Sequence, residues 1–236
     1  MQAGSRMPGE SCQECEYRSL RLFCNLSGAT LQRFEGLGVH AAFPGRTIVF
    51  EEGQRPRSIF VICTGQLKLS TTSKEGRTMI LRIAGPGDVL GLSATLNDLP
   101  YEVTAETLEP TRVKSVHRTE FLQFLEEHGE VGQNSAKVIA KEYREVFLDA
   151  RRLALSGSAA GRLSQLLLEW AQGSSCGKPE LRFTMALTHE ELANMAGISR
   201  ETVTRLLNQF ERDHLISRHG VAFTILDPAN LELLVQ

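Results

Sequence analysis

The sequence predicts an α+β protein that joins an N-terminal β-rich module to one long helix and a C-terminal winged helix-turn-helix. Turn-forming residues recur about every 8 to 12 residues between Pro44 and Pro110, which indicates short strands in a sandwich, barrel or roll. A helical pattern with one glycine covers residues 131–155. Two capped helices that meet at a glycine lie near the C-terminus, in the pattern of a helix-turn-helix.

Composition excludes several classes of protein. With 236 residues, 42% hydrophobic and 23% charged, the chain has the balance of a globular protein of one to three modules. A net charge of −2 and an isoelectric point of about 6.3 exclude a generally basic nucleic-acid coat. No apolar run is long enough to span a bilayer, and the first ten residues lack the apolar core of a signal peptide. We therefore expect a cytoplasmic protein without membrane contact.

Residues 1–26 are predicted to form an N-terminal arm that is unusual for its cysteines. Cys12, Cys15 and Cys24 lie within thirteen residues of one another. Disulfides are disfavoured in the cytoplasm, so clustered thiols indicate metal binding or redox chemistry. The other two cysteines have simpler interpretations, Cys63 as a buried core residue and Cys176 as a loop thiol.

Residues 27–130 are predicted to form the β-rich domain. A short helix begins after Ser27 and ends near Leu37, and the pattern becomes helical again after Arg118. Four strand-like runs bounded by turn residues are expected at Thr47–Phe50, Ile59–Cys63, Leu67–Thr71 and Met79–Ile83.

The helix over residues 131–155 carries a narrow apolar stripe whose spacing alternates between four and three. This spacing is typical of a coiled-coil seam and predicts self-association. The alternative is an amphipathic helix that packs on its own domain. The stripe residues proposed for the dimer contact are Ile139, Tyr143, Val146, Ala150 and Leu153.

Residues 156–236 are predicted to form a second module after a break at 156–158. Its first helix is expected over residues 162–172. Further on, a capping box opens a short helix, Gly197 turns the chain, and a capped second helix runs to about Arg212. A hairpin near residues 215–225 would be the wing. The capping residues are Thr188, Glu191 and Ser199.

The second helix has one purely apolar face and one polar face, which is the chemistry of a major-groove reader. Arginine can bind guanine in a bidentate way, and glutamate can accept from cytosine. The residues proposed to read bases are Arg200, Glu201, Thr204 and Arg205. Those proposed to contact phosphates are Thr188, His189, Ser199, Thr202, Gln209 and Arg218.

Three alternatives remain open. From residue 156 onward the chain holds seven Lys and Arg against nine Asp and Glu, which also suits a helical hairpin with a solvated face. The second alternative is a sensor protein whose helix-turn-helix no longer reads DNA. The third is a thiol oxidoreductase built on Cys12 and Cys15, but no buried strand precedes Cys12 as that chemistry requires, so we expect no enzyme activity.

Two segments resemble the Crp/Fnr family of bacterial transcription regulators. The segment Ile198–Arg205 is similar to the family's DNA-reading signature, and Gly85–Gly91 resembles its glycine turn. The resemblance covers nearly the whole chain. It implies a double-stranded β-roll of the cyclic-nucleotide-binding-like jelly-roll type as sensor domain, a dimerisation helix and a winged helix-turn-helix. It also implies a homodimer on a palindromic operator in double-stranded DNA, and RNA polymerase as a partner if the protein is an activator.

The resemblance also bears on the signal. Cyclic-nucleotide-binding members use a glutamate and an Arg-Ser pair, where this chain has Leu92-Ser93-Ala94 and Leu99-Pro100-Tyr101. A buried phosphate without an arginine is costly, so cyclic AMP is not expected to bind in the usual mode.

The arm, in contrast, is similar to the cluster ligands of the oxygen-sensing branch and implies an iron–sulfur cluster or zinc. The family's fourth cysteine aligns near Val113–Lys114, where this chain has none, so Cys63, His117 or a carboxylate would complete the set. A thiol redox switch and the absence of any sensory role are the alternatives.

Overall fold

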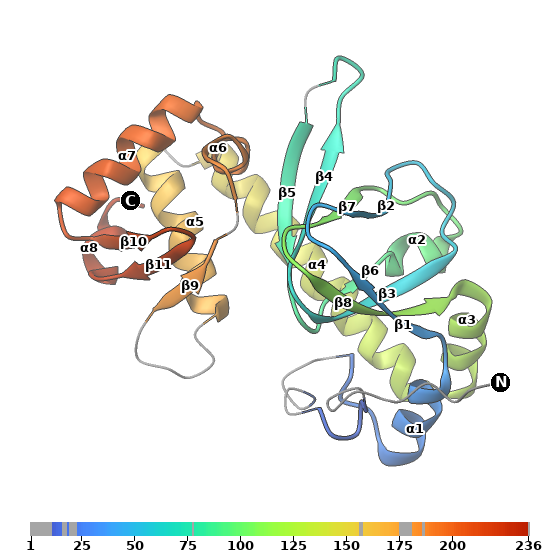
Figure 1. Ribbon diagram of the computed structural model, residues 1–236. Coiled ribbons are helices and arrows are strands. Elements are labelled where there is room, and N and C mark those ends of the chain that lie inside the picture. The colour runs from blue at the N-terminus through green and yellow to red at the C-terminus, as the bar shows by residue number, and fades with distance from the viewer. Residues whose placement is uncertain are drawn as a thin grey trace. The chain divides into compact units, whose positions relative to one another are not determined.

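The computed structural model describes residues 11–15, 18, 23–76, 78–155, 158–174, 181–185 and 187–235, without the side chains of 149–155 and 172–174 (Figure 1). Cys176 lies outside the described residues. The chain divides into two compact units, one of residues 1–71 and 82–144 and the other of residues 72–81 and 145–236.

Two four-stranded sheets, most of whose residues belong to the first unit, form the β-roll and confirm that prediction. One sheet has the order β1-β8-β3-β6 and the other β2-β7-β4-β5. Helix α1 (Gly28–Gly36) precedes them and α2 (Leu92–Asn97) follows β6. The strands are β1 (Val39–Phe43), β2 (Ile48–Phe50), β3 (Ser58–Thr64), β4 (Leu67–Thr72), β5 (Thr78–Ala84), β6 (Val89–Leu90), β7 (Thr104–Thr107) and β8 (Thr111–His117).

Strand β3 of the first sheet has buried residues on both of its faces. Ile62 on β3 joins Phe50 and Leu69 of the other sheet in one hydrophobic cluster. Its neighbour Val61 points the opposite way, into a second cluster that includes Phe34 of α1 and residues of the two helices after the roll. Because successive strand residues alternate between faces, β3 supplies both cores.

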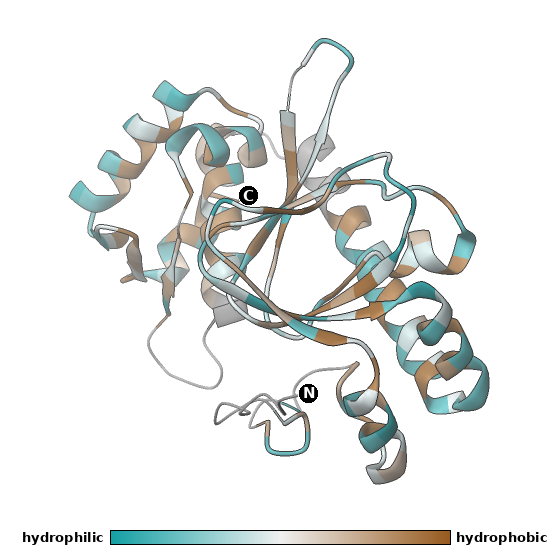
Figure 2. Cartoon of the chain, turned by 45° about the vertical axis from the view of Figure 1, so that its right-hand side comes forward, coloured by the Kyte–Doolittle hydropathy of each residue, from teal (hydrophilic) through white to brown (hydrophobic). Residues whose placement is uncertain are grey.

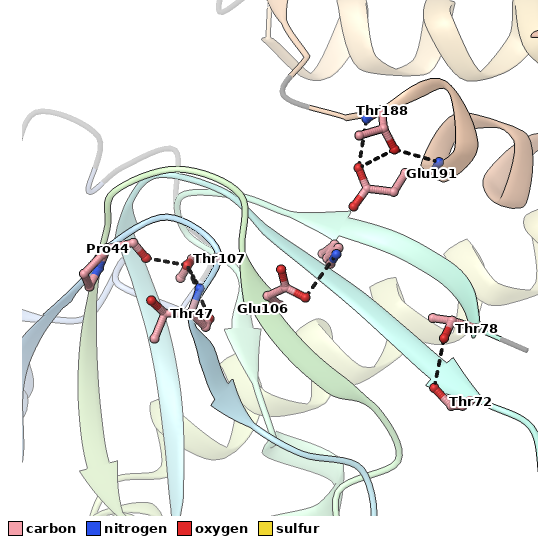
Figure 3. Close-up of polar contacts among 9 residues, drawn as sticks. Pro44, Thr47, Thr72, Thr78, Glu106, Thr107, Thr188 and Glu191 are labelled. Atoms are coloured by element: carbon pink, nitrogen blue, oxygen red, sulfur yellow. Dashed lines mark hydrogen bonds and ion pairs between the residues drawn. The ribbon is translucent and has the colours of Figure 1, made fainter. Parts of the chain in front are cut away.

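A buried threonine fixes the turn that leads into β2 (Figure 3). The Thr107 hydroxyl donates to the Pro44 carbonyl oxygen at 2.6 Å and accepts from the Thr47 amide at 2.9 Å. Beside it, Lys68 and Glu106 form an ion pair of 3.0 Å across β4 and β7. The two Thr107 hydrogen bonds satisfy backbone groups that the turn leaves outside the sheet ladder.

The four strand-like runs predicted from the sequence are confirmed, with ends that differ by a residue or so. The β-rich region is longer than expected, because β1 lies before Pro44 and β8 follows Pro110. The sequence pattern did not predict strand β8, because Lys114 lies at an interior position of this strand and lysine is rarely buried.

Two helices follow the roll, α3 (Arg118–Glu127) and α4 (Gly129–Leu155). The long helix predicted from Val131 therefore begins at Gly129. No helix among the described residues is both long enough and apolar enough to cross a membrane. Figure 2 shows hydrophobic and hydrophilic segments following one another within single helices, as expected for helices with one packed face.

The second unit contains the predicted winged helix-turn-helix. The wing strands β10 and β11 form a three-stranded sheet with β9, in the order β10-β11-β9. The elements are α5 (Ala159–Ser174), β9 (Arg182–Thr184), α6 (His189–Ala196), α7 (Arg200–Arg212), β10 (Ile216–His219), β11 (Ala222–Ile225) and α8 (Pro228–Leu233).

Candidate nucleic-acid interface and thiol cluster

Both helices of the helix-turn-helix begin with the caps predicted from the sequence. The Thr188 hydroxyl accepts from the Glu191 amide at 3.2 Å, and the Glu191 carboxylate accepts from the Thr188 amide at 2.8 Å (Figure 3). The Ser199 hydroxyl accepts from the Thr202 amide at 3.2 Å and caps α7. These caps satisfy amides that a helix start leaves without a partner, and they fix where each helix begins.

The turn between the helices depends on a left-handed glycine and on an arginine that the sequence did not indicate. Gly197 ends α6 with φ +63°, a conformation that costs little without a side chain. Arg162 of α5 donates to the Ala196 carbonyl oxygen at 2.9 Å and reaches that of Gly197 at 3.4 Å. A cation at the last carbonyl groups of α6 also complements the helix dipole.

Helix α7 has the two faces that its sequence predicts. Its apolar side chains are buried, namely Val203, Leu206, Leu207 and Phe210. Arg200, Glu201 and Arg205 are exposed on the remaining surface. Hydrogen bonds from its own amide and from the Ser199 hydroxyl lower the pKa of Glu201, so this side chain is a carboxylate at neutral pH. Two cations and one anion are therefore presented from one helix.

Thr204, which we expected to read bases, is engaged within the domain. Its hydroxyl donates to the Arg200 carbonyl oxygen at 3.0 Å. Its oxygen also lies 2.8 Å from Nδ1 of His189, at the start of α6. Burial lowers the pKa of His189, and the Arg218 and Arg200 charges lower it further, so the imidazole is neutral at neutral pH.

Arg218 of the wing, expected at a phosphate, binds two side chains of α7. Its guanidinium donates to Glu211 at 2.5 Å and to Asn208 at 2.9 Å. The Arg218 hydrogen bond, together with its charge, lowers the pKa of Glu211. A cavity of about 310 Å³ lies beside this contact, with His189 and Val221 in its wall. Arg218 thus joins the wing to α7.

The other phosphate candidates divide into engaged and exposed side chains. The hydroxyls of Thr188, Ser199 and Thr202 take part in the two caps. Gln209 is exposed on α7. All of them lie on the helix-turn-helix, as the sequence indicated.

The stripe on α4 is partly described. Tyr143 is 74% exposed and Val146 66% exposed, while Ile139 is 36% exposed. The side chains of Ala150 and Leu153 lie outside the described residues. Phe147 and Leu148, which the stripe did not include, are also exposed, so the apolar surface of α4 is wider than a coiled-coil seam.

Two of the positions that would contact a cyclic nucleotide, Leu92 and Tyr101, belong to the hydrophobic cores of the roll. Leu92 is buried in the cluster that faces the helices. Tyr101 is 4% exposed, stacks on Phe50 with ring centroids 4.1 Å apart, and donates from its hydroxyl to the Ser58 carbonyl oxygen at 2.7 Å. A packed leucine and a tyrosine with its hydroxyl already bonded offer no partner for a sugar hydroxyl or a cyclic phosphate.

The cysteines of the arm lie near the helix-facing side of the first sheet. Cys12 and Cys15 are half-buried and Cys24 is buried, while Cys63 on β3 is half-buried; all four are thiols. Cys12 packs on the cluster that contains Phe34 and Val61. The expected core role of Cys63 therefore holds only in part, because its side chain reaches the surface of the core.

A buried lysine lies among these thiols. Lys114 is 1% exposed, and its Nζ donates to the Glu35 carbonyl oxygen at 3.1 Å, 5.3 Å from the centroid of the Phe34 ring. Burial lowers the pKa of Lys114, and the nearby Cys12 and Cys63 thiols act in the opposite direction. The other groups that act on Lys114 are Glu35 and Cys24.

The donor set does not fit the metal centre that the cysteine spacing implied. Within the described part of the chain, no group of three or more Cys, His, Asp and Glu side chains is arranged to hold a metal ion. Lys114 lies at one of the two positions where the fourth thiolate was expected, and a protonated amine cannot coordinate a metal. His117, one of the candidates for the fourth ligand, caps α3 by accepting from the Thr119 amide at 3.4 Å.

Comparisons with known families agree with the order of these modules. A model described as "Cyclic nucleotide-binding domain" matches residues 41–128, and one described as "Crp-like helix-turn-helix domain" matches residues 161–234. The two ranges correspond to the roll with α3 and to the winged helix-turn-helix.

Individual relatives are named as regulators. The chain is 30% identical over 191 residues to the CRP-like cAMP-activated global transcriptional regulator of Mycobacterium tuberculosis, covering 80% of this chain and 84% of that one. It is 25% identical over 232 residues to the nitrogen fixation regulation protein FixK of Bradyrhizobium diazoefficiens, covering 96% and 94%. Its fold is similar to that of FixK2 from Bradyrhizobium japonicum, with a TM-score of 0.77 at 19% identity, over 85% and 98% of the two chains.

Proposed function

Because the chain belongs to the Crp/Fnr family of DNA-binding transcription regulators, we propose that it binds a palindromic operator as a homodimer and responds to a signal through its N-terminal arm and β-roll. The observation that carries this proposal is the polar face of α7, which presents Arg200, Glu201 and Arg205 while its apolar side is buried. Such a helix can enter a major groove without exposing core residues.

Only some of the polar residues of α7 are proposed to contact bases. Arg200 and Arg205 suit guanine, and Glu201 suits the amino group of cytosine. Thr204 and Arg218 already have partners within the domain, so we assign them first to positioning α7 against α6 and the wing. The caps at Thr188 and Ser199 place helix N-termini that can bind phosphates.

We infer a homodimer from the apolar surface of α4. Tyr143, Val146 and Phe147 expose large apolar side chains along a 27-residue helix, and pairing two such helices would remove them from water. A dimer also doubles the limited cationic surface of a module with net negative charge. As a regulator it would work in the cytoplasm beside the DNA, and an activator would contact RNA polymerase.

For the signal, we favour thiol chemistry over cyclic AMP or an iron–sulfur cluster. Leu92 and Tyr101 occupy core positions where a nucleotide would need polar groups. Lys114 places a cation among the thiols that a cluster would require as ligands. We therefore propose that the signal is oxidation of cysteines in the arm and the β-roll, and not binding of a cofactor.

The test is a gel shift with palindromic DNA of varied half-site sequence. Arg205→Ala should lose about 1–3 kcal/mol of binding to the preferred operator and relax discrimination at one base pair. Arg182→Ala, on β9, is the matched control for loss of one arginine and should change specific affinity little. Unchanged affinity in Arg205→Ala, with intact circular dichroism, would favour a sensor that acts without reading bases.

A further inference from the structure

We propose that Cys12 and Cys63 form a peroxide-reactive thiol pair beside the buried ammonium of Lys114, and that oxidation joins them in a disulfide that fastens the arm to the β-roll. Hydrogen peroxide or an organic hydroperoxide is the oxidant class. The proposal concerns a modification site, and its regulatory consequence rests on the function proposed above.

Strand pairing places Cys63 beside Lys114. Lys114 on β8 pairs with Val61 on β3, so their side chains share the helix-facing side of the sheet. Cys63 is the extra residue of a bulge, since Ile62 and Thr64 pair with successive residues of β8. A bulge redirects a side chain and makes it available for a role outside the ladder.

Two hydrogen bonds place Cys12 at the same lysine. Gln13, the next residue, donates from Nε2 to the Glu35 carboxylate at 3.0 Å. The Glu35 carbonyl oxygen in turn accepts from Lys114 Nζ at 3.1 Å. Cys12 and Lys114 are also the strongest charge partners of each other, with Cys63 next for both. The three side chains therefore lie near one another, between the arm and the helix-facing side of the sheet.

The surroundings distinguish the two thiols. Burial raises the pKa of Cys12, and the Lys114 ammonium opposes that rise by stabilising the thiolate. The Cys63 thiol donates a weak hydrogen bond to the Val61 carbonyl oxygen at 3.8 Å. Because Lys114 is its largest stabilising charge, we assign Cys12 as the sulfur that attacks the peroxide and Cys63 as the resolving thiol.

The chemistry balances in two steps. The Cys12 thiolate attacks one oxygen of hydrogen peroxide, the O–O bond breaks, and the products are Cys12 sulfenic acid and hydroxide, which takes a proton from solvent to become water. With an organic hydroperoxide the leaving alkoxide takes that proton and becomes an alcohol. The Cys63 sulfur then displaces the sulfenic hydroxyl, which leaves as water with the Cys63 proton. Two electrons pass from the two thiols to the peroxide.

The arm leads directly into residues that bind the start of α4. Ser27 is hydrogen-bonded to Glu130 through its amide at 3.0 Å and its hydroxyl at 2.5 Å. The Asn25 carbonyl oxygen accepts from Asn134 at 3.4 Å. Fastening Cys12 to the sheet therefore constrains the segment that holds the first turns of the dimerisation helix.

The experiment treats full-length protein, purified under anaerobic reducing conditions, with hydrogen peroxide and maps disulfides by non-reducing digestion and mass spectrometry. We expect a Cys12–Cys63 linked peptide in wild type and in Cys15→Ser. Cys63→Ser should give no such link and should accumulate a dimedone adduct at Cys12. Lys114→Met should slow formation of the adduct or disulfide about three- to tenfold, because it removes the charge that stabilises the thiolate.

A link from Cys12 to Cys15 or Cys24, or oxidation that leaves Cys63 reduced, would overturn the pairing. So would one equivalent of tightly bound zinc or iron per chain in the reduced protein. Lys114→Met is interpreted only if its circular dichroism matches wild type. If it does not fold, the loss of the link and the dimedone adduct at Cys12 in Cys63→Ser decide. Reduced protein that fails to bind any palindrome would instead contradict the proposed function and leave the thiol pair standing.

Discussion

His189, the first residue of α6, is joined to Thr204 on α7 by a 2.8 Å contact between Nδ1 and Oγ1. Thr204 has one hydroxyl proton and donates it to the Arg200 carbonyl oxygen. The imidazole must therefore be the donor, which assigns the proton of the neutral ring to Nδ1. This contact couples the two helices of the helix-turn-helix at the surface that would face DNA.

Thr204→Val should lower stability without changing which bases are preferred. Valine keeps the shape of threonine but leaves the His189 N–H without its acceptor, at a cost of about 1 kcal/mol. Urea unfolding measures the loss, and operator selection from a random library measures base preference. Thr204→Ser, which retains the hydroxyl, is the control. A change of preferred base in Thr204→Val would return Thr204 to the base-reading set.

His189 should make stability fall as the pH drops from 7.5 to 5.5. Its folded pKa lies below the ordinary value of about 6.5, because of burial and the Arg218 and Arg200 charges. Between the two pKa values the unfolded chain binds a proton that the folded chain does not, so unfolding is favoured. The variant His189→Gln should lose less stability over this pH range than wild type. Equal losses in urea titrations at the two pH values would contradict the assignment.

Glu211→Gln should raise affinity for non-specific DNA and steepen its salt dependence. The change releases Arg218, whose side chain is 18% exposed, from its ion pair with Glu211. If Arg218 then reaches a phosphate, the logarithmic salt slope becomes more negative by about 0.9. Glu232→Gln on α8 removes the same charge elsewhere and controls for net charge. Identical slopes for the two variants would show that Arg218 serves the wing alone.

The elements that the sequence predicted well are those held by local contacts. The capping box of α6, the Ser199 cap of α7, the left-handed Gly197 and the apolar side of α7 all depend on residues close to one another in the sequence, and the pattern located all of them. The short strands between turns were located for the same reason.

The features that the sequence did not predict depend on residues far apart in the chain. Lys114 interacts electrostatically with the thiols of residues 12 and 63. Arg162 donates a hydrogen bond to a turn more than thirty residues away. No periodicity marks such partners. A buried lysine inside a strand even weakened the alternation by which β8 could have been recognised, because the pattern assumes that buried positions are apolar.

Gly91→Ala should destabilise the β-roll by about 1–3 kcal/mol, because two penalties act at one position. Gly91 has φ +74°, and a Cβ there would lie 2.6 Å from Cε1 of the Tyr101 ring. Gly53→Ala separates the two, since Gly53 has φ +82° with open space around the added carbon. Thermal unfolding should show a larger loss for Gly91→Ala. Equal losses would mean that Tyr101 moves aside and is not fixed by its stack on Phe50.

Glu130→Gln should weaken the attachment of the arm to α4 at neutral pH and have little effect near pH 3. Hydrogen bonds from Ser27 and Thr30 lower the pKa of Glu130, with the Ser27 hydroxyl as the largest cause. A carboxyl with a depressed folded pKa stabilises the fold fully above the ordinary value of about 4.3 and loses that contribution as the pH falls through the folded value. The pair is at the surface, so we expect Glu130→Gln to lower the free energy of unfolding by about 1 kcal/mol at pH 7.

Glu126→Gln, on α3, is the matched control and should give a smaller loss. Urea unfolding at both pH values, with hydrogen exchange of the Ser27 amide, measures the effect. A loss in Glu130→Gln that is as large at pH 3 as at pH 7 would mean that the carboxylate charge does not hold Ser27, and that the arm is joined to α4 by Asn134 and by packing.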